Sequence, residues 1–300
     1  MSTGPSCSSW AREAGVRPLG TAAHATGWLL VDWPLPWPKD PKHVEALAPV
    51  REAVRGTGIR IQLVVPSEGD GRRVVLHDDG PDDDGWFDRH RRREAVVGGA
   101  DVVDAARSLV TDRDAGEPIE ATDVLICAHG TRDRCCGSLG TALAMTAAAA
   151  GANVRRTSHL GGHRFAATAL LLPEGTSWGY LEPESLDALV TRSRPPAELA
   201  PNLRGSTALD GAGMQAADGA ALAEVGWAWL DGPRRARPAA DGTADSYDVE
   251  SRDHGSWRVT VEKRRRLPVP VCGEAPESAP KAETEMEIVA IVPTAEALDR

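Results

Sequence analysis

The sequence predicts an α/β protein, because segments with the patterns of strands and helices alternate along the chain. Short apolar runs typical of buried strands occur at 28–33 (WLLVDW), 59–65 (IRIQLVV) and 123–126 (DVLI). Apolar residues with helical spacing follow the first run at 43–55 and the third at 138–150. Alternating strands and helices of this kind are typical of α/β architectures.

The most informative order of elements lies in the second third of the chain. The expected elements are a strand at 123–126, a helix at 138–150, a strand at 152–157, strands at 165–172 and 178–181, and a helix at 184–191. Loops that contain glycine separate the first strand from the helix and the second strand from the third. This order is that of a thioredoxin-like fold.

Three regions are expected along the chain: an N-terminal α/β region (1–115), a thioredoxin-like region that binds the cofactor (116–200), and a small C-terminal α+β extension (201–300). The charged block at 78–94 is expected to form a solvated loop. Three prolines at 194–201 predict a linker before the extension.

Within the extension, apolar spacing predicts a helix near 216–229. The alternating segments WRVTVEKRR (257–265) and MEIVAIV (286–292) predict a small antiparallel sheet.

Composition limits the classes of partner. The 300 residues carry a formal net charge of −10, which argues against a general role in nucleic-acid binding. The Ala-rich run at 141–150 is shorter than the about 20 apolar residues that span a bilayer. The N-terminal stretch MSTGPSCSSWAREAG does not have the pattern of a signal peptide. We therefore expect a cytoplasmic protein with no membrane or nucleic-acid partner, in which five cysteines serve metal or redox chemistry rather than a disulfide framework.

Two pairs of potential metal ligands stand at the ends of predicted elements. In CAHGTRDRCC, Cys127 ends a strand and Cys136 begins a helix, whose macrodipole favours a thiolate. In HLGGH, two glycines between His159 and His163 let the backbone turn tightly, so that both imidazoles can face one point. We expect the four side chains to converge, because the two loops lie side by side in a thioredoxin-like fold. Such a set could hold a 2Fe–2S cluster or a zinc ion.

Two other kinds of protein compete with an iron–sulfur protein. A structural zinc site accepts the same four ligands, although zinc fingers normally place paired ligands two to four residues apart, whereas Cys127 and Cys136 are nine apart. A thiol–disulfide oxidoreductase would use Cys135 and Cys136, but vicinal cysteines form a poor dithiol pair and the sequence has no CxxC motif. No pair of carboxylates stands out for glycoside hydrolysis.

The segments CAHGTRDRCCG and SHLGGHRFAATALLLPEG resemble the signature of the sucrase/ferredoxin-like family, which includes the actin-patch-distribution proteins. PLGTA (18–22) and WLLVDWP resemble the N-terminal part of that family, and the resemblance covers about 7–189. The family is related to thioredoxin-like ferredoxins, which bind 2Fe–2S clusters through four cysteines. The resemblance implies that His159 and His163 replace the second cysteine pair here.

The other cysteines, His129 and Asp133 are not expected to be ligands. In the family pattern the ligand directly precedes a glycine, which selects Cys136 and leaves Cys135 as a packing residue or spare thiol. Cys7 and Cys272 lie far from the motifs in sequence and are not expected to be ligands. His129 is expected to order the first loop through a hydrogen bond, and Asp133 is expected to brace it.

The charge of the expected centre indicates how it would work. Two thiolates and two neutral imidazoles leave an oxidised 2Fe–2S centre neutral, so that its reduction potential is higher than with four thiolates. Reduction makes the imidazoles more basic, which couples electron uptake to proton uptake. The sequence thus favours a non-catalytic electron carrier or redox sensor, with redox proteins as its partners, over an enzyme.

Overall fold

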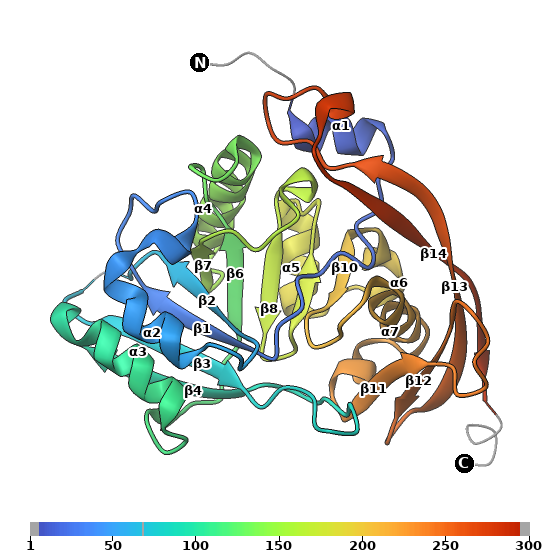
Figure 1. Ribbon diagram of the computed structural model, residues 1–300, viewed down its shortest axis with the longest axis horizontal. Coiled ribbons are helices and arrows are strands. Elements are labelled where there is room, and N and C mark those ends of the chain that lie inside the picture. The colour runs from blue at the N-terminus through green and yellow to red at the C-terminus, as the bar shows by residue number, and fades with distance from the viewer. Residues whose placement is uncertain (1–5, 68, 295–300) are drawn as a thin grey trace.

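The computed structural model describes residues 6–67 and 69–294, so that the first five residues of the stretch tested for a signal peptide lie outside it. A ten-stranded mixed sheet forms the centre of the fold (Figure 1). Its strands are adjacent in the order β10–β9–β8–β6–β7–β2–β1–β3–β4–β5. Their bounds are β1 (Gly27–Asp32), β2 (Ile59–Val64), β3 (Arg72–Asp78), β4 (Arg91–Val97), β5 (Glu117–Pro118), β6 (Asp123–Cys127), β7 (Val154–Thr157), β8 (Ala169–Leu172), β9 (Thr176–Trp178) and β10 (Leu203–Ser206). The α/β class predicted from the sequence is confirmed.

The two halves of this sheet share one topology. In the first half, β1 pairs in parallel with β2 and antiparallel with β3, which pairs antiparallel with β4. In the second half, β6 pairs in parallel with β7 and antiparallel with β8, which pairs antiparallel with β9. The halves meet where Val64 of β2 pairs antiparallel with Thr157 of β7. The chain thus builds the same strand arrangement twice.

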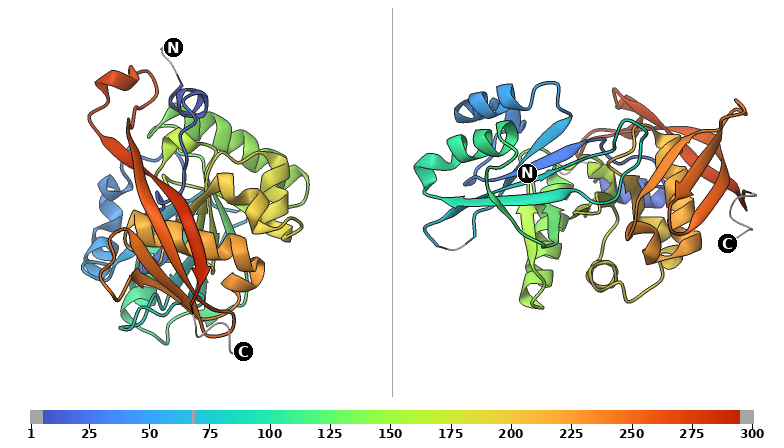
Figure 2. Two further views of the ribbon diagram at one scale, coloured as in Figure 1. Left: turned by 90° about the vertical axis from the view of Figure 1, so that its right-hand side faces the viewer. Right: turned by 90° about the horizontal axis from the view of Figure 1, so that it is seen from below.

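The two halves face each other across a shared apolar core. Side chains of β1, β2 and β3 pack there against side chains of β6 and β8, and the strands of the halves run in different directions (Figure 2). All residues of β1 and β6 are buried, which explains their continuous apolar runs. The members of this core are Ala25, Trp28, Leu30, Val64, Val75, Leu125, Cys127, Cys136, Leu160, Leu170 and Leu172.

Helices cover the outer faces of both halves. The pair α2 (Ala48–Ala53) and α3 (Val102–Thr111) packs on the first half, and α4 (Thr141–Ala149) and α5 (Pro183–Thr191) pack on the second. The other α-helices are α1 (Cys7–Glu13), α6 (Pro196–Leu199) and α7 (Ala212–Val225). Short helical turns lie at η1 (Pro41–His43), η2 (Glu45–Leu47), η3 (Gly99–Asp101), η4 (Cys136–Gly140), η5 (His163–Phe165), η6 (Ala200–Asn202), η7 (Trp227–Leu230) and η8 (Pro276–Ser278).

The C-terminal part forms a separate four-stranded antiparallel sheet, as the alternating sequence predicts. Its strands are β11 (Arg234–Pro238), β12 (Ser246–Ser251), β13 (Gly255–Pro268) and β14 (Ala282–Pro293). Helix α7 lies between this sheet and the second half of the large one (Figure 1). Its middle, residues 215–222, is buried on all sides, which explains why the helix consists mainly of Ala and Gly. The long β13–β14 hairpin carries its connection to α1 (Figures 1 and 2).

Several expected elements differ in extent. The helix expected at 43–55 is divided into η2 and the shorter α2, and η1 precedes them. The expected loop at 78–94 gives its last four residues to β4, and the expected linker at 194–201 contains α6 and η6. The helix near 216–229 begins earlier, at Ala212. The large sheet runs through both the expected N-terminal region and the expected thioredoxin-like region.

A network of buried charges joins the two halves. Asp123 of β6 accepts a hydrogen bond of 2.8 Å from Arg92 of β4 and lies 2.9 Å from the Nε2 atom of His77. Arg155 of β7 contacts Asp123 at 3.6 Å and also pairs with Asp32. Burial alone would raise the pKa of Asp123, but His77 and Arg92 lower it below its ordinary value. The carboxylate is therefore ionised in the native protein.

Asp123→Ala should lower the free energy of unfolding by about 3–5 kcal/mol, because it leaves buried cations without their counter-charge. Urea unfolding at neutral pH measures this loss. Asp104→Ala is the control: the Asp104 side chain is 81% exposed and lies 3.6 Å from Arg107, so that its loss should cost less than about 1 kcal/mol. Equal losses for the two variants would contradict the proposed importance of the network.

The network also predicts a dependence of stability on pH. Because the folded pKa of Asp123 is depressed, its contribution is complete above the unfolded pKa of about 3.9 and is lost as the pH falls through the folded value. Asp123→Asn should therefore lose less stability than the wild type between pH 5 and strong acid. Parallel curves for the two proteins would argue against a depressed pKa.

Candidate metal centre

Cys127 is fixed by the backbone at the end of β6. Its amide donates a hydrogen bond of 3.0 Å to the carbonyl of Thr168, and the amide of Ala128 donates one of 3.0 Å to Thr157. The side chain is fully buried in the core between the sheet halves. The strand that the sequence predicts at this point thus holds the Cys127 sulfur away from solvent.

Cys136 begins η4, a single turn of π-helix that leads into α4. Such turns are frequent at functional sites. A Cβ atom at Gly140 would overlap the carbonyl oxygen of Cys127, and one at Gly137 would press on Gly130. These two glycines therefore let the turn lie directly against the end of β6, which brings the Cys136 side chain beside that of Cys127.

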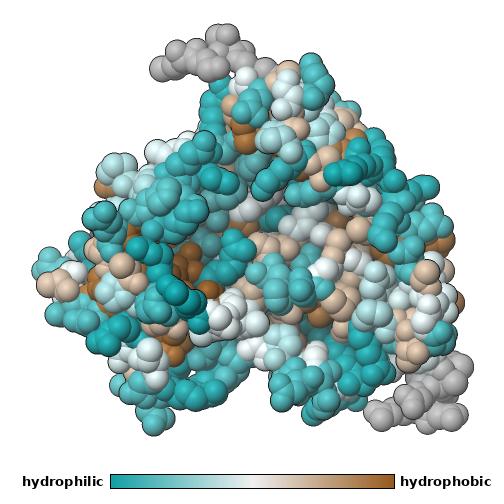
Figure 3. All heavy atoms as spheres, in the orientation of Figure 1, coloured by the Kyte–Doolittle hydropathy of each residue, from teal (hydrophilic) through white to brown (hydrophobic). Residues whose placement is uncertain are grey.

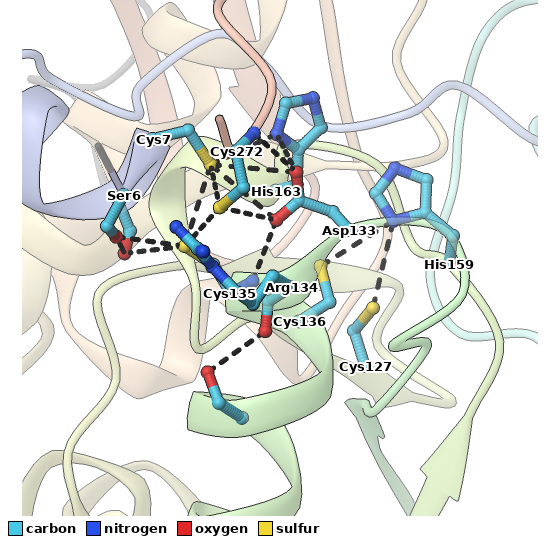
Figure 4. Close-up of polar contacts among 12 residues, drawn as sticks. Ser6, Cys7, Cys127, Asp133, Arg134, Cys135, Cys136, His159, His163 and Cys272 are labelled. Carbon is cyan, nitrogen blue, oxygen red and sulfur yellow. Dashed lines mark hydrogen bonds and ion pairs between the residues drawn. The ribbon is translucent and has the colours of Figure 1, made fainter. Parts of the chain in front are cut away.

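His159 completes a group of three potential ligands. Its Nδ1 atom lies 3.8 Å from the sulfur of Cys127 and 3.8 Å from that of Cys136. The ligand atoms of all three lie within 4.8 Å of one another (Figure 4). His129 joins the loop after β6 to the loop that carries His159. Its Nδ1 accepts a hydrogen bond of 3.2 Å from the His159 amide, and its Nε2 donates one of 3.0 Å to the carbonyl of Pro38. The loop-ordering hydrogen bond predicted for His129 is present.

His163 lies next to this group but faces a second one. The two glycines before it have left-handed backbone, with φ of +82° at Gly161 and +66° at Gly162, as the predicted tight turn requires. The centre of the His163 ring lies 5.8 Å from that of His159. Its Nδ1 atom lies 3.4 Å from an oxygen of Asp133 and 3.4 Å from the sulfur of Cys7. Three of the four predicted ligands thus converge, and the fourth is their neighbour.

A buried cation accompanies the two thiols. Arg204 of β10 is 1% exposed and donates hydrogen bonds to the carbonyls of Gly161 (3.2 Å) and Thr21. Burial lowers its pKa to about 10, so that it stays charged at neutral pH. A hydrogen bond with the Cys136 thiol lowers the pKa of Cys127 well below its ordinary value, while that of Cys136 is raised. The buried guanidinium and the two thiols thus influence one another electrostatically.

Arg204 was not predicted as a site residue, because it lies outside both motifs, in the region expected to be an extension. The second group consists of residues that were not expected to be ligands but that the fold brings together. The Sγ atoms of Cys7 and Cys135 lie 3.7 Å apart, and that of Cys272 lies 2.9 Å from Cys135. Asp133 contacts Cys7 and Cys272. Spacing along the chain gives no sign of this group, because its members come from distant segments.

The geometry defines an α/β protein with buried Cys and His groups that could hold a metal. The model of the sucrase/ferredoxin-like family matches residues 18–205, more than half of the chain. The chain therefore belongs to the sucrase/ferredoxin-like family. Comparisons with curated proteins and with solved structures find no match. Among the residues that the structure describes, no helix has the length and apolar character needed to cross a membrane.

Gly162→Ala should destabilise the protein more than Gly151→Ala. Both glycines have positive φ, and alanine costs about 1–2 kcal/mol in that conformation. Space around Gly151 is open, but a Cβ at Gly162 would lie 2.7 Å from the Cζ of buried Arg204. The extra cost should be about 1–3 kcal/mol, measured by urea unfolding. An equal loss in both variants would show that Arg204 does not fix the loop.

Proposed function

We propose that the chain binds a 2Fe–2S cluster through Cys127, Cys136, His159 and His163 and serves as an electron carrier of thioredoxin-like fold. The observation that carries the proposal is the convergence of two buried thiols and a half-buried imidazole within 4.8 Å of one another. Thiolate and imidazole are the ligand types of bis-histidinyl iron–sulfur centres. Membership of the sucrase/ferredoxin-like family agrees with it.

The placement of the fourth ligand favours a cluster over a zinc ion at this site. A structural zinc ion needs four ligand atoms around one point. Here the His163 ring is displaced, with its centre 5.8 Å from that of His159. A displaced fourth ligand suits a cluster of two irons better than a single ion, because each iron binds only two of the four protein ligands. His163 contacts Asp133 and Cys7 through its Nδ1 atom, so that its Nε2 atom would be the iron ligand.

A thiol–disulfide oxidoreductase that uses Cys135 and Cys136 is less favourable. The two sulfurs belong to different groups: Cys136 lies with Cys127 and His159, whereas Cys135 lies with Cys7 and Cys272. An adjacent pair whose side chains point to different partners is poorly placed for reversible disulfide formation.

The surrounding residues support electron transfer. A bound 2Fe–2S cluster takes up and releases one electron at a time. The charged Arg204 offsets negative charge near the sulfurs, the apolar core excludes water, and His129 orients the His159 loop. We propose a redox protein as the partner. A cavity of about 280 Å³ lies beside His159, and Lys42, Arg51 and Arg60 are among the residues that line it. The molecular face that Figure 3 shows is mainly hydrophilic, with apolar patches between the polar regions.

Cys127→Ser and Cys136→Ser should each abolish iron binding, because each removes a thiolate ligand. Cys135→Ser is the matched control, since Cys135 is adjacent in sequence and buried but belongs to the other group. Iron and acid-labile sulfide assays on freshly purified protein, together with its visible spectrum, decide the question. Iron lost in the Cys135 variant and retained in the other two would overturn the ligand assignment.

Replacement of both His159 and His163 by Cys should keep a cluster but lower its reduction potential, because two more thiolates add negative charge to the centre. The wild-type potential should fall as the pH rises, since reduction raises the proton affinity of ligand imidazoles. The double variant should lose this dependence. Protein-film voltammetry from about pH 5 to 10 covers the ordinary His and Cys pKa range. A wild-type potential independent of pH would remove the histidines from the ligand set.

A further inference from the structure

A second set of metal-binding side chains lies beside the proposed cluster site. We define the three-cysteine group as Cys7, Cys135 and Cys272 together with Asp133, whose ligand atoms all lie within 4.8 Å of one another. Figure 4 shows the three sulfurs around the carboxylate. Cys7, Cys135 and Asp133 are at most 5% exposed, and Cys272 is half-buried. Only Cys135 and Asp133 of this group fall within the part of the chain that the family model matches.

Three separate parts of the fold supply this group. Cys7 is the first residue of α1, Cys135 precedes η4, and Cys272 lies in the connection between β13 and β14. The hairpin brings that connection beside α1 (Figures 1 and 2). Apolar packing alone does not require three thiols to meet around a buried carboxylate. Their meeting therefore indicates a ligand for them.

The distances fit one tetrahedral metal ion. With metal–sulfur bonds of about 2.3 Å and metal–oxygen bonds of about 2.0 Å, sulfurs lie about 3.8 Å apart and a sulfur and an oxygen about 3.5 Å apart. The Cys7 sulfur lies 3.7 Å from Cys135 and 3.6 Å from Cys272. An oxygen of Asp133 lies 3.6 Å from the Cys7 sulfur and 3.3 Å from that of Cys272. The separation of 2.9 Å between Cys135 and Cys272 is shorter and would open on binding.

We propose that the three-cysteine group binds one zinc ion through three thiolates and the Asp133 carboxylate. Three soft sulfur ligands and one oxygen in tetrahedral array suit zinc. The site shares no ligand with the proposed iron–sulfur cluster. Its role is structural: it ties α1 and the β13–β14 connection to the loop that carries Cys136.

Asp133 connects the two sites. One of its oxygens accepts a hydrogen bond of 2.8 Å from the Cys135 amide, and the other accepts one of 3.2 Å from the Cys272 amide. Its carboxylate also lies 3.4 Å from the Nδ1 atom of His163. Carboxylates in this position commonly orient a ligand histidine. Zinc would thus fix the residue that contacts His163.

Measurement of zinc and iron in the same purified chain tests the proposal. The full-length protein, purified without oxygen from zinc-containing medium, should hold about one zinc ion per chain. Cys7→Ser and Cys272→Ser should lose zinc and keep iron, whereas Cys127→Ser should lose iron and keep zinc. Ser8→Ala is the matched control: Ser8 is buried next to Cys7 and donates a hydrogen bond of 3.2 Å to Cys135, but it is not a zinc ligand. It should keep both metals.

Further measurements separate a failed fold from a failed proposal. Cys272→His, which retains a ligand for zinc, should keep zinc where Cys272→Ser loses it. In a Cys127→Ser background, Co²⁺ added to metal-free protein should give thiolate-to-cobalt absorption that Cys272→Ser removes. The proposal would be overturned if Cys272→Ser retained zinc or left the cobalt absorption unchanged. It would also be overturned if the purified wild-type protein held no zinc and contained a Cys135–Cys272 disulfide. Wild-type protein that holds zinc but no iron would overturn the cluster and leave the zinc site standing.

Discussion

The contact between η4 and the end of β6 is the constraint on which the site depends. At Gly140 the helical turn lies so close to the Cys127 carbonyl oxygen that no side chain fits between them. Because of this contact, two cysteines nine residues apart share one buried position between the sheet halves. The intervening loop carries buried Asp133, which contacts Cys7 of α1 and Cys272 of the β13–β14 connection. One backbone contact therefore sets the place of both Cys groups.

The duplicated topology shows how one strand arrangement serves two purposes. Cys127 ends the first strand of the second half, and Asp32 ends the first strand of the first half. Asp32 pairs with buried Arg155, whereas Cys127 has buried Arg204 as the nearby cation. Asp32 and Cys127 are thus both acidic groups with an arginine nearby. A carboxylate forms an ion pair with its arginine, whereas a thiolate is also a good metal ligand. The choice of residue at one equivalent position thus separates an ion-pair network from a group of side chains that could hold a metal.

The sequence allowed the local parts of this arrangement to be predicted. Apolar runs identified most of the strands of both halves, and spacing within two short motifs identified Cys127, Cys136 and His159, which converge. Contacts between distant segments could not be predicted. Cys272 meets Cys135 across 137 positions, because a long hairpin sets their distance, and no local pattern encodes its length. Arg92 and Arg93 look like solvated charges in sequence, yet they are buried with partners from other segments.

The nearness of the two Cys groups bears on the electrostatics of both. Three thiolates and a carboxylate beside His163 would place strong negative charge near the proposed cluster and oppose its reduction. A bound zinc ion would neutralise half of that charge, and the nearby cation Arg204, which donates a hydrogen bond to the carbonyl of Gly161, also opposes it. Without zinc, a hydrogen bond with Cys135 and burial raise the pKa of the Cys7 thiol and favour its neutral form, whereas the same hydrogen bond lowers the pKa of Cys135 to about 4. The group without zinc would thus still place negative charge beside His163, and zinc binding would offset it.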